Sequence, residues 1–247
     1  MTKPAEIAEI PLEILRDDAG LRVMRRAGQS DRMVVCFSSV GAGPDVPPPP
    51  EWQRLAGRNP SDHLLFLADP ARSWLNRPEL IEEMGDTITA ESTRLQVRRT
   101  AAIGFSLGGF STLVMPAFAK IDVALALSPQ ISVDPSVVPE EKRWKLYRDK
   151  IAYYRIRSAE DHIQPHCQYF IFLGAHPRER LQRQQVGHHP NLDYYVMANS
   201  NHNTQVRLKE AGVLDAVIDA CFDGARDRVQ QIMAEKFGSA RLTPGHF

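Results

Sequence analysis

The chain has 247 residues, 43% of them hydrophobic, which is enough to bury the core of one large α/β domain spanning residues 1–247. Its 30 basic and 30 acidic residues cancel, so no global charge favours nucleic acid or an anionic membrane, and we expect a small-molecule partner. Residues 1–18 carry acids where a secretory signal is basic, and no apolar run approaches membrane-spanning length. The three cysteines, Cys36, Cys167 and Cys221, lack the paired spacing of a disulfide framework. Together these features predict a cytoplasmic protein.

The N-terminal part of the chain predicts an edge hairpin followed by the first buried strands. Residues 10–15 and 21–26 alternate apolar and polar side chains on either side of a polar turn, which is typical of an antiparallel hairpin. Residues 32–38 and 63–68 are continuous apolar runs, as expected for strands buried on both faces of a parallel sheet. Residues 78–97 then have apolar positions at helical spacing, so we expect a crossover helix there.

Residues 100–109 (TAAIGFSLGG) combine a short buried strand with a glycine-rich turn centred on Ser106, and a helix is predicted to follow until Pro116 disturbs it. A serine on so tight a turn adopts strained backbone geometry, and the glycines two residues before and after it let strand and helix approach closely. The pattern predicts a nucleophile whose hydroxyl stands clear of the sheet. The backbone N–H of Leu107, at the helix N-terminus, would then face an oxyanion forming beside the serine.

The second half of the chain continues the alternation of strands and helices, with one insertion at residues 131–165. We expect this insertion to form a small cap built around an amphipathic helix over the basic, aromatic-rich residues 140–158. The basic residues leave open an acidic or phosphorylated substrate, whereas the neutral overall charge disfavours nucleic acid. The remaining predicted strands are 122–127, 168–173 and 192–197, and the remaining predicted helices are 180–186, 204–222 and 223–237.

His202 follows the last predicted strand, where a loop can bring its imidazole to Ser106. Because an imidazole can accept a proton from serine and return it to a leaving group at neutral pH, His202 is the candidate general base. A carboxylate must orient the imidazole, and it is expected on a loop between these two residues in chain order. Glu179, on the exit loop of the strand at 168–173, is the first choice, and Asp134 is the second. The other histidines lack the spacing of a metal site, so no metal is expected.

The chain resembles the α/β-hydrolase fold over residues 33–214. The resemblance rests on Gly104-Phe105-Ser106-Leu107-Gly108-Gly109, which matches the family's G-x-S-x-G elbow, and on His202, which matches the family's histidine. It implies a three-layer sandwich with a mostly parallel, roughly eight-stranded sheet and helices on both faces. It also implies a serine hydrolase that cleaves a small ester, thioester or amide through an acyl-enzyme, without a cofactor. An acyltransferase of the same fold and a non-catalytic binding protein of this fold stay open as alternatives.

The resemblance further implies that a second oxyanion donor comes from the loop after the first buried strand. Val40 and Ser39 are the candidates on this loop, which has Ser38-Ser39 where the family often has a His-Gly pair. Trp74, on a loop at the carboxyl edge of the sheet where ligands usually bind, and Phe105, in the elbow, are candidates for the wall of a substrate pocket.

Overall fold

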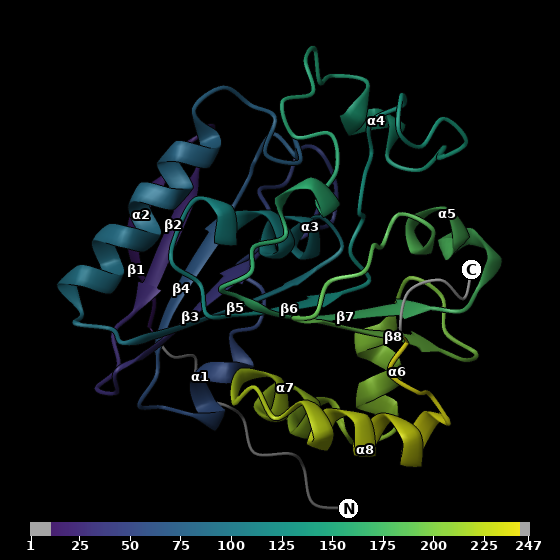
Figure 1. Cartoon of the computed structure of the whole chain (residues 1–247). Helices are drawn as coiled ribbons and strands as arrows, with labels where there is room; N and C mark the ends of the chain where they lie inside the picture. The colour runs from purple at the N-terminus through teal and green to yellow at the C-terminus, as the bar shows by residue number, and fades with distance from the viewer. Residues whose placement is uncertain (1–10, 243–247) are drawn as a thin grey trace, which may run out of the picture.

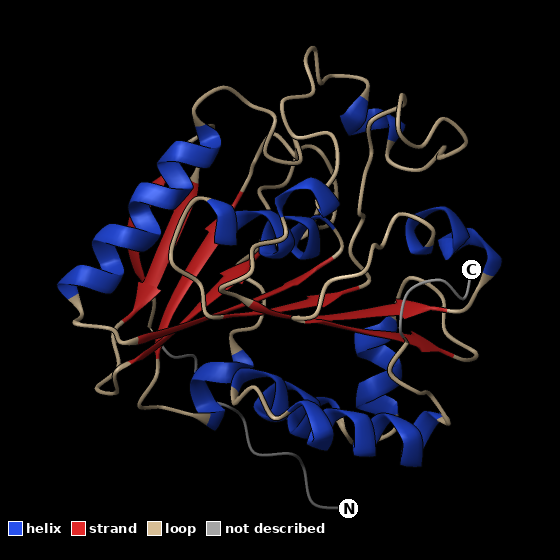
Figure 2. Ribbon diagram, in the orientation of Figure 1, coloured by secondary structure: helices blue, strands red, loops and turns tan. Residues whose placement is uncertain are grey.

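The structure is a computed structural model that describes residues 11–242, except for the side chains of residues 56 and 57. The described residues form three layers, with one twisted sheet between two layers of helices (Figure 1, Figure 2). The architecture confirms the predicted α/β-hydrolase-like sandwich. In spatial order the eight strands are β1 (Glu13–Asp17), β2 (Arg22–Arg26), β4 (His63–Ala68), β3 (Arg32–Phe37), β5 (Arg99–Phe105), β6 (Val123–Leu127), β7 (Gln168–Gly174) and β8 (Leu192–Met197).

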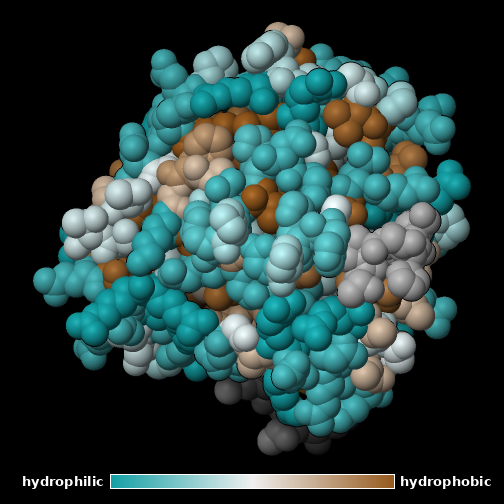
Figure 3. Space-filling model, viewed as in Figure 1, coloured by the Kyte–Doolittle hydropathy of each residue, from teal (hydrophilic) through white to brown (hydrophobic). Residues whose placement is uncertain are grey.

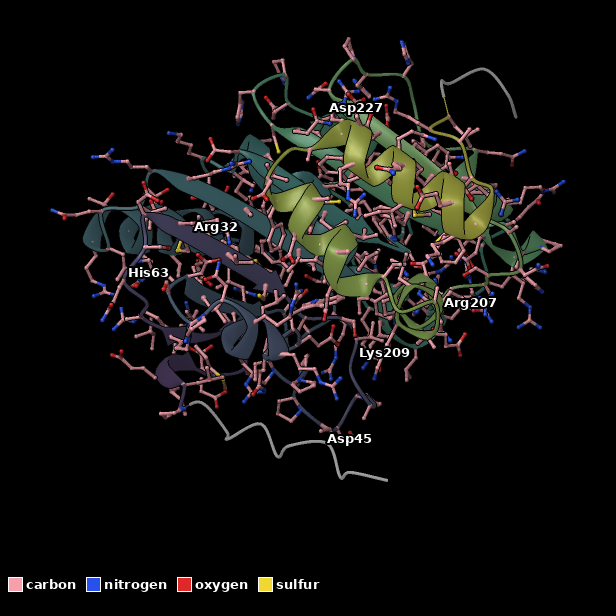
Figure 4. The ribbon with its side chains drawn as sticks, turned by 90° about the horizontal axis from the view of Figure 1, so that it is seen from below. Arg32, Asp45, His63, Arg207, Lys209 and Asp227 are labelled. Carbon is pink, nitrogen blue, oxygen red and sulfur yellow. The ribbon has the colours of Figure 1, made fainter. Side chains whose placement is uncertain are left out.

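Helices cover both faces of this sheet. They are α1 (Arg54–Arg58), α2 (Leu80–Arg94), α3 (Leu107–Val114), α4 (Lys145–Arg148), α5 (Arg180–Arg183), α6 (Thr204–Glu210), α7 (Leu214–Phe222) and α8 (Arg226–Phe237). In Figure 1, α2 and α3 lie above the sheet, and α1, α6, α7 and α8 lie below it. The insertion at residues 131–165 carries α4 and lies above the sheet, on the same side as α3. Figure 4 looks at the opposite side, where α7 and α8 cross the strands.

The six strands β4, β3, β5, β6, β7 and β8, which are neighbours in that order, are mutually parallel. Strand β2 is antiparallel to both of its neighbours, β1 and β4. The register keeps the carboxyl ends together, because Phe37 at the end of β3 pairs with Gly104, and Phe105 at the end of β5 pairs with Leu127. The loops that follow these parallel strands therefore leave the sheet at one shared edge. This is the edge at which open α/β sheets usually bind ligands.

Each face of the sheet supports its own hydrophobic core, because side chains alternate along a strand. On β3, Met33, Val35 and Phe37 face the core beneath α2 and α3, whereas Val34 and Cys36 face the core covered by α7 and α8. Burial on both faces explains why the parallel strands are continuous apolar runs in the sequence. It also fixes the register, since a shift by one residue would exchange the two cores.

The structure corrects the helix predicted at residues 140–158. Only α4, with four residues, is α-helical there, and the rest of the segment is irregular. Trp144, just before α4, has a φ of 58°, a left-handed conformation that interrupts a helix. Glu141 and Arg148 are buried rather than solvated, and the Arg148 guanidinium donates to the Glu141 carbonyl. Specific polar contacts, which the periodicity of the sequence does not reveal, determine the path of this segment.

Other predicted boundaries also change. The helix predicted at 204–222 divides into α6 and α7, because Gly212 takes a φ of 71° and ends α6. The helix predicted at 180–186 shortens to α5 and follows a 3₁₀ turn at Pro177–Glu179. The elbow helix already begins at Leu107 and continues into a 3₁₀ turn, Met115–Ala117, that contains the proline expected to disturb it. The predicted hairpin corresponds to β1 and β2, and its residue 10 lies outside the described residues.

The surface seen in Figure 3 is mostly hydrophilic, with small hydrophobic areas separated by polar side chains. Within residues 11–242, no helix has both the length and the apolar character needed to cross a membrane.

Candidate active site

The elbow after β5 holds Ser106 in a backbone conformation that few side chains adopt. Ser106 has φ 58° and ψ −119°, and its N–H donates to the Leu127 carbonyl at 3.0 Å. The turn is tight enough to require glycine on both sides: a Cβ on Gly104 would lie 2.1 Å from the Gly108 carbonyl oxygen. A Cβ on Gly108 would lie 2.3 Å from the carbonyl oxygen of Phe37, so the elbow contacts the end of β3 directly.

The structure brings His202 to this serine. His202 lies on the loop between β8 and α6, and its Nε2 is 2.9 Å from Ser106 Oγ. The imidazole lies beside two aromatic rings, with ring centroids 5.1 Å from Phe105 and 5.3 Å from Trp144. The imidazole is thus placed by packing as well as by hydrogen bonding, as a general base requires.

Glu179 lies at the other ring nitrogen of His202, on the side that faces away from the serine. Its Oε2 is 3.3 Å from His202 Nδ1, at the long end of hydrogen-bonding distance. The carboxylate is 1% exposed, and burial opposes its ionisation. The hydrogen bond and charge of His202, together with the charge of Arg143, outweigh this effect and lower the pKa of Glu179 below its usual value. Glu179 is therefore an anion at neutral pH.

Arg143, from the insertion, binds the second oxygen of Glu179. Its Nη1 donates to Glu179 Oε1 at 2.5 Å, and its Nη2 donates to Glu141 Oε2 at 2.7 Å. The same guanidinium lies 4.3 Å from the ring centroid of Trp144, which itself packs on His202. The insertion thus contacts the base through an aromatic ring and the acid through an ion pair.

Gln130 is a further polar side chain at the serine, on the segment that follows β6. It is fully buried, and its Nε2 lies 2.8 Å from Ser106 Oγ and 3.3 Å from His202 Nε2. Its Oε1 accepts a hydrogen bond from the indole N–H of Trp74 at 3.1 Å. Ser106 Oγ consequently has two nitrogen neighbours, one from a histidine and one from an amide.

Trp74 packs against residues of the site and does not line an open pocket. Its side chain is fully buried and packs edge-on against Trp144, with ring centroids 6.4 Å apart. The loop that carries it is strained, because Arg72, Trp74 and Leu75 all have φ values between 48° and 61°. The structure therefore places Trp74 at the site but in a supporting position, whereas Phe105 contacts His202 directly.

The oxyanion candidates differ in what their backbone groups contact. Leu107 is the first residue of α3, so its N–H has no partner inside the helix and lies next to the serine in the chain. Ser39 is engaged elsewhere: its hydroxyl donates to Glu51 Oε1 at 2.5 Å, and its backbone also hydrogen-bonds to that carboxylate. The carbonyl of Val40 accepts from Arg72 Nε at 3.2 Å, which positions the loop after β3. Within residues 11–242, no acceptor binds the N–H of Val40, so Val40 is the better placed of the two loop candidates.

Asp134, the second choice for the acid, is directed away from the site. Its carboxylate accepts from Arg157 Nε at 2.8 Å and from the hydroxyl and N–H of Ser136. Asp193, a further acidic residue that precedes His202 in the chain, lies within β8 and accepts from Arg226. Across the described part of the chain, no three histidine, cysteine or acidic side chains gather as metal ligands would.

A cavity of about 650 Å³ lies between the loop after β4 and the insertion. Its lining includes Arg72, Asn76, Tyr147 and Lys150, and Arg72 also stacks on the Tyr147 ring at 5.7 Å. The catalytic candidates are not part of this lining, but the cavity and the site share the loop that carries Trp74.

Sequence reasoning missed Gln130, Arg143 and Trp144 as site residues. Gln130 had a usable signal, because it is a polar residue just past the carboxyl end of the strand next to the elbow strand. Arg143 and Trp144 had none, since they come from the irregular insertion whose path depends on tertiary contacts.

Solved structures share this fold at low sequence identity. Capsule O-acetyltransferase of Neisseria meningitidis serogroup A is 12% identical, with a TM-score of 0.58 over 87% of this chain and 96% of that chain. A putative esterase from Staphylococcus aureus is 13% identical, with a TM-score of 0.54 over 87% and 84% of the two chains. Est1E from Butyrivibrio proteoclasticus is 13% identical, with a TM-score of 0.57 over 84% and 98%. No protein-family model and no curated protein sequence matches the chain. The fold is therefore the α/β-hydrolase fold, and the likeness is to the fold alone.

Proposed function

We propose that this protein is a serine hydrolase that cleaves a small-molecule ester, thioester or amide through an acyl-enzyme. The observation that carries the proposal is the serine, histidine and glutamate arrangement at the carboxyl edge of the sheet. His202 Nε2 lies 2.9 Å from Ser106 Oγ, and the buried carboxylate of Glu179 lies on the opposite ring nitrogen. This is the order of contacts that nucleophilic catalysis by serine requires.

In the first half of the reaction, Ser106 Oγ attacks the acyl carbon while its proton passes to His202 Nε2. The oxyanion that forms is stabilised by the N–H of Leu107 and by one N–H from the loop after β3, for which Val40 is the candidate. The imidazolium is stabilised by Glu179, whose second carboxylate oxygen accepts a hydrogen bond from Arg143. The leaving group departs with the proton from Nε2, and an acyl ester remains on the serine.

In the second half, a nucleophile loses its proton to His202 Nε2 and attacks the acyl-enzyme. The Oγ–carbon bond then breaks, and Oγ recovers the proton from the imidazolium. The nucleophile is water in a hydrolase.

An acyltransferase is the second candidate, because the site is enclosed. Ser106 is 2% exposed, and Trp144 of the insertion packs on the base. Limited access of water favours an alcohol or another acceptor that has its own binding surface. One of the structures with this fold is a capsule O-acetyltransferase, which is a property of that protein and a reason to test acceptors here. Product analysis with candidate alcohols in the presence of an activated acetyl ester separates transfer from hydrolysis.

The primary test is covalent labelling of the intact protein by a fluorophosphonate probe. The parent is expected to label, and Ser106→Ala is expected to lose labelling while it remains folded. Ser111→Ala is the matched control, because Ser111 is a buried serine on α3, the helix that follows Ser106, and its hydroxyl donates to the Leu107 carbonyl. Labelling of Ser106→Ala at the parent rate, with Ser111→Ala also unchanged, would exclude Ser106 as the nucleophile.

The base is tested by His202→Gln, which is expected to lower the rate of activated-ester hydrolysis by about 10³-fold or more. A fall of less than about tenfold would point to another base. A parent protein that neither labels nor hydrolyses activated esters would instead favour a binding protein of this fold.

The proposed location is the cytoplasm, with a small acyl compound as substrate and neither nucleic acid nor a membrane as partner. The three cysteines support a reducing compartment, because all are buried and unpaired and burial raises the pKa of each thiol. Fractionation of the native protein tests this proposal.

A further inference from the structure

Gln130 contacts the reacting oxygen in a way that the serine, histidine and glutamate arrangement does not use. Its amide nitrogen lies 2.8 Å from Ser106 Oγ, closer than the 3.3 Å that separates it from His202 Nε2. The side chain is fully buried, so both of its polar atoms need partners inside the protein. The inference that follows rests on the proposed function and adds a residue to it.

The orientation of the Gln130 amide is determined by chemistry. The indole N–H of Trp74 can only donate, so the group 3.1 Å from it must be the carbonyl oxygen of Gln130. The NH₂ group of Gln130 therefore faces Ser106. An inverted amide would place two donors against each other at Trp74 and leave both unsatisfied in the core.

Trp74 is itself held firmly. It is fully buried, and the strained loop around it is tied down by its neighbours. Arg72 donates to the carbonyls of Pro70 at 2.6 Å and Gly43 at 2.7 Å, and the N–H of Ser73 donates to Asp69 at 2.6 Å. Strain that is maintained by so many contacts is typical of a loop that positions a functional group.

We propose that Gln130 is a further catalytic residue, which donates a hydrogen bond to Ser106 Oγ during acyl transfer. A serine hydroxyl has one donor hydrogen and two acceptor lone pairs. When Gln130 occupies one lone pair, the hydroxyl hydrogen is directed to His202 Nε2, the acceptor at 2.9 Å. The hydroxyl is then aligned for proton transfer before the substrate binds.

The same N–H also stabilises charge on the oxygen as bonds change. When Oγ bonds to the acyl carbon its proton moves to His202 Nε2, and in the second half of the reaction the electron pair of the breaking carbon–oxygen bond returns to Oγ. Negative charge gathers on Oγ in the first step as its proton leaves before the bond to carbon is complete, and in the second step as that bond breaks before the imidazolium returns the proton. A donor fixed by Trp74 stabilises this charge without having to reorganise.

The test compares four variants with the parent by pre-steady-state acylation with p-nitrophenyl acetate and by thermal unfolding. Gln130→Met removes the donor and keeps the length of the side chain. Gln130→Glu keeps the shape but places a carboxylate oxygen at Ser106, which would draw the hydroxyl hydrogen away from His202. Trp74→Phe leaves Gln130 in place and removes the indole N–H that orients it, together with part of the ring that packs against Trp144. Trp52→Phe is the matched control, because the Trp52 indole N–H has no hydrogen-bond partner among the described residues.

Both Gln130 variants are expected to lower the acylation rate constant by about tenfold to a hundredfold, with the apparent Kd for the ester within about twofold of the parent. Trp74→Phe is expected to lower the acylation rate constant by about threefold to tenfold, and Trp52→Phe is expected to lower it by less than about twofold. A residue with a purely structural role would lower the unfolding temperature without this selective loss of acylation.

Two results would overturn the inference. The first is that a folded Gln130→Met or Gln130→Glu variant acylates at the parent rate. The second is that either folded variant acylates faster than the parent, which would mean that the Gln130 amide slows the reaction of Ser106. Either result is distinct from a failure of the proposed function, in which the parent itself does not acylate at Ser106. In that case the proposed role of Gln130 is refuted together with the proposed function.

Discussion

Replacing Glu179 with glutamine tests the acid of the site with almost no change in side-chain shape. Glu179 has two partners on its two oxygens, Arg143 on Oε1 at 2.5 Å and His202 Nδ1 on Oε2 at 3.3 Å. A glutamine has only one oxygen, so it can accept from one of these groups and must direct its NH₂ to the other.

The shorter and charged contact decides the orientation. Hydrogen bonds to a cation are about twice as strong as neutral ones, so the glutamine oxygen is expected to face Arg143. Its NH₂ group then faces His202 Nδ1 and makes that nitrogen an acceptor. The imidazole hydrogen is forced onto Nε2, which removes the lone pair that must take the proton of Ser106.

We therefore expect Glu179→Gln to lower the acylation rate by about 10³- to 10⁴-fold, equivalent to about 4–5.5 kcal/mol of transition-state stabilisation. The loss of folding free energy should be smaller, about 1–3 kcal/mol, because Arg143 keeps Glu141 as a partner and is one-quarter exposed. Stopped-flow acylation and chemical denaturation measure the two quantities separately.

A second substitution tests the cause of this loss. In Arg143→Met/Glu179→Gln the glutamine is free to rotate, so its oxygen can accept from His202 Nδ1 and restore the useful tautomer. We expect the double variant to acylate about tenfold faster than Glu179→Gln alone, although it lacks a further polar contact. The reasoning is refuted if Glu179→Gln stays within tenfold of the parent, or if the double variant is slower than the single one.

Two further predictions concern the stability of the site. Because the pKa of Glu179 is lowered in the folded protein, its ionisation contributes stability above its unfolded pKa near 4.5, and this is lost as pH falls through the folded value. Chemical denaturation should therefore show the stability gap between parent and Glu179→Gln narrowing from pH 6 to pH 3; a constant gap would contradict it. Gly108→Ala should cost about 1–3 kcal/mol and slow labelling, since the new Cβ would lie 2.3 Å from the Phe37 carbonyl. Gly43→Ala is the control and should leave the free energy of unfolding nearly unchanged, because its new Cβ would have no atom within 4 Å. Equal thermal melting curves for the two variants would argue against a tight elbow.

The sequence was sufficient to predict the residues whose position follows from parallel topology. Ser106, Glu179 and His202 each come just after a different parallel strand, and such segments must meet at one edge of the sheet. The continuous apolar runs identified those strands. The structure brings the three residues together, and their catalytic roles remain predictions until they are measured.

The contacts of the insertion could not be predicted in the same way. The spacing of Trp144 and its aromatic neighbours fits a helix, but the segment is shaped by partly buried ion pairs such as Arg143 with Glu179, 36 residues apart. Gln130 depends on Trp74, 56 residues away, for its orientation. Pairings over such distances leave no periodic signal in a single sequence, because periodicity reports only which face of an element is buried.

The backbone of Ser106 has a consequence for any attempt to engineer this protein. A φ of 58° with a ψ of −119° is a conformation that only glycine adopts without strain, and holding another residue there costs on the order of 1–3 kcal/mol. Stabilising selection acting on thermostability alone would therefore favour glycine at position 106 and eliminate the nucleophile. Thermostable variants should be selected under a simultaneous requirement for covalent labelling, since heat resistance and reactivity make opposite demands on this one residue.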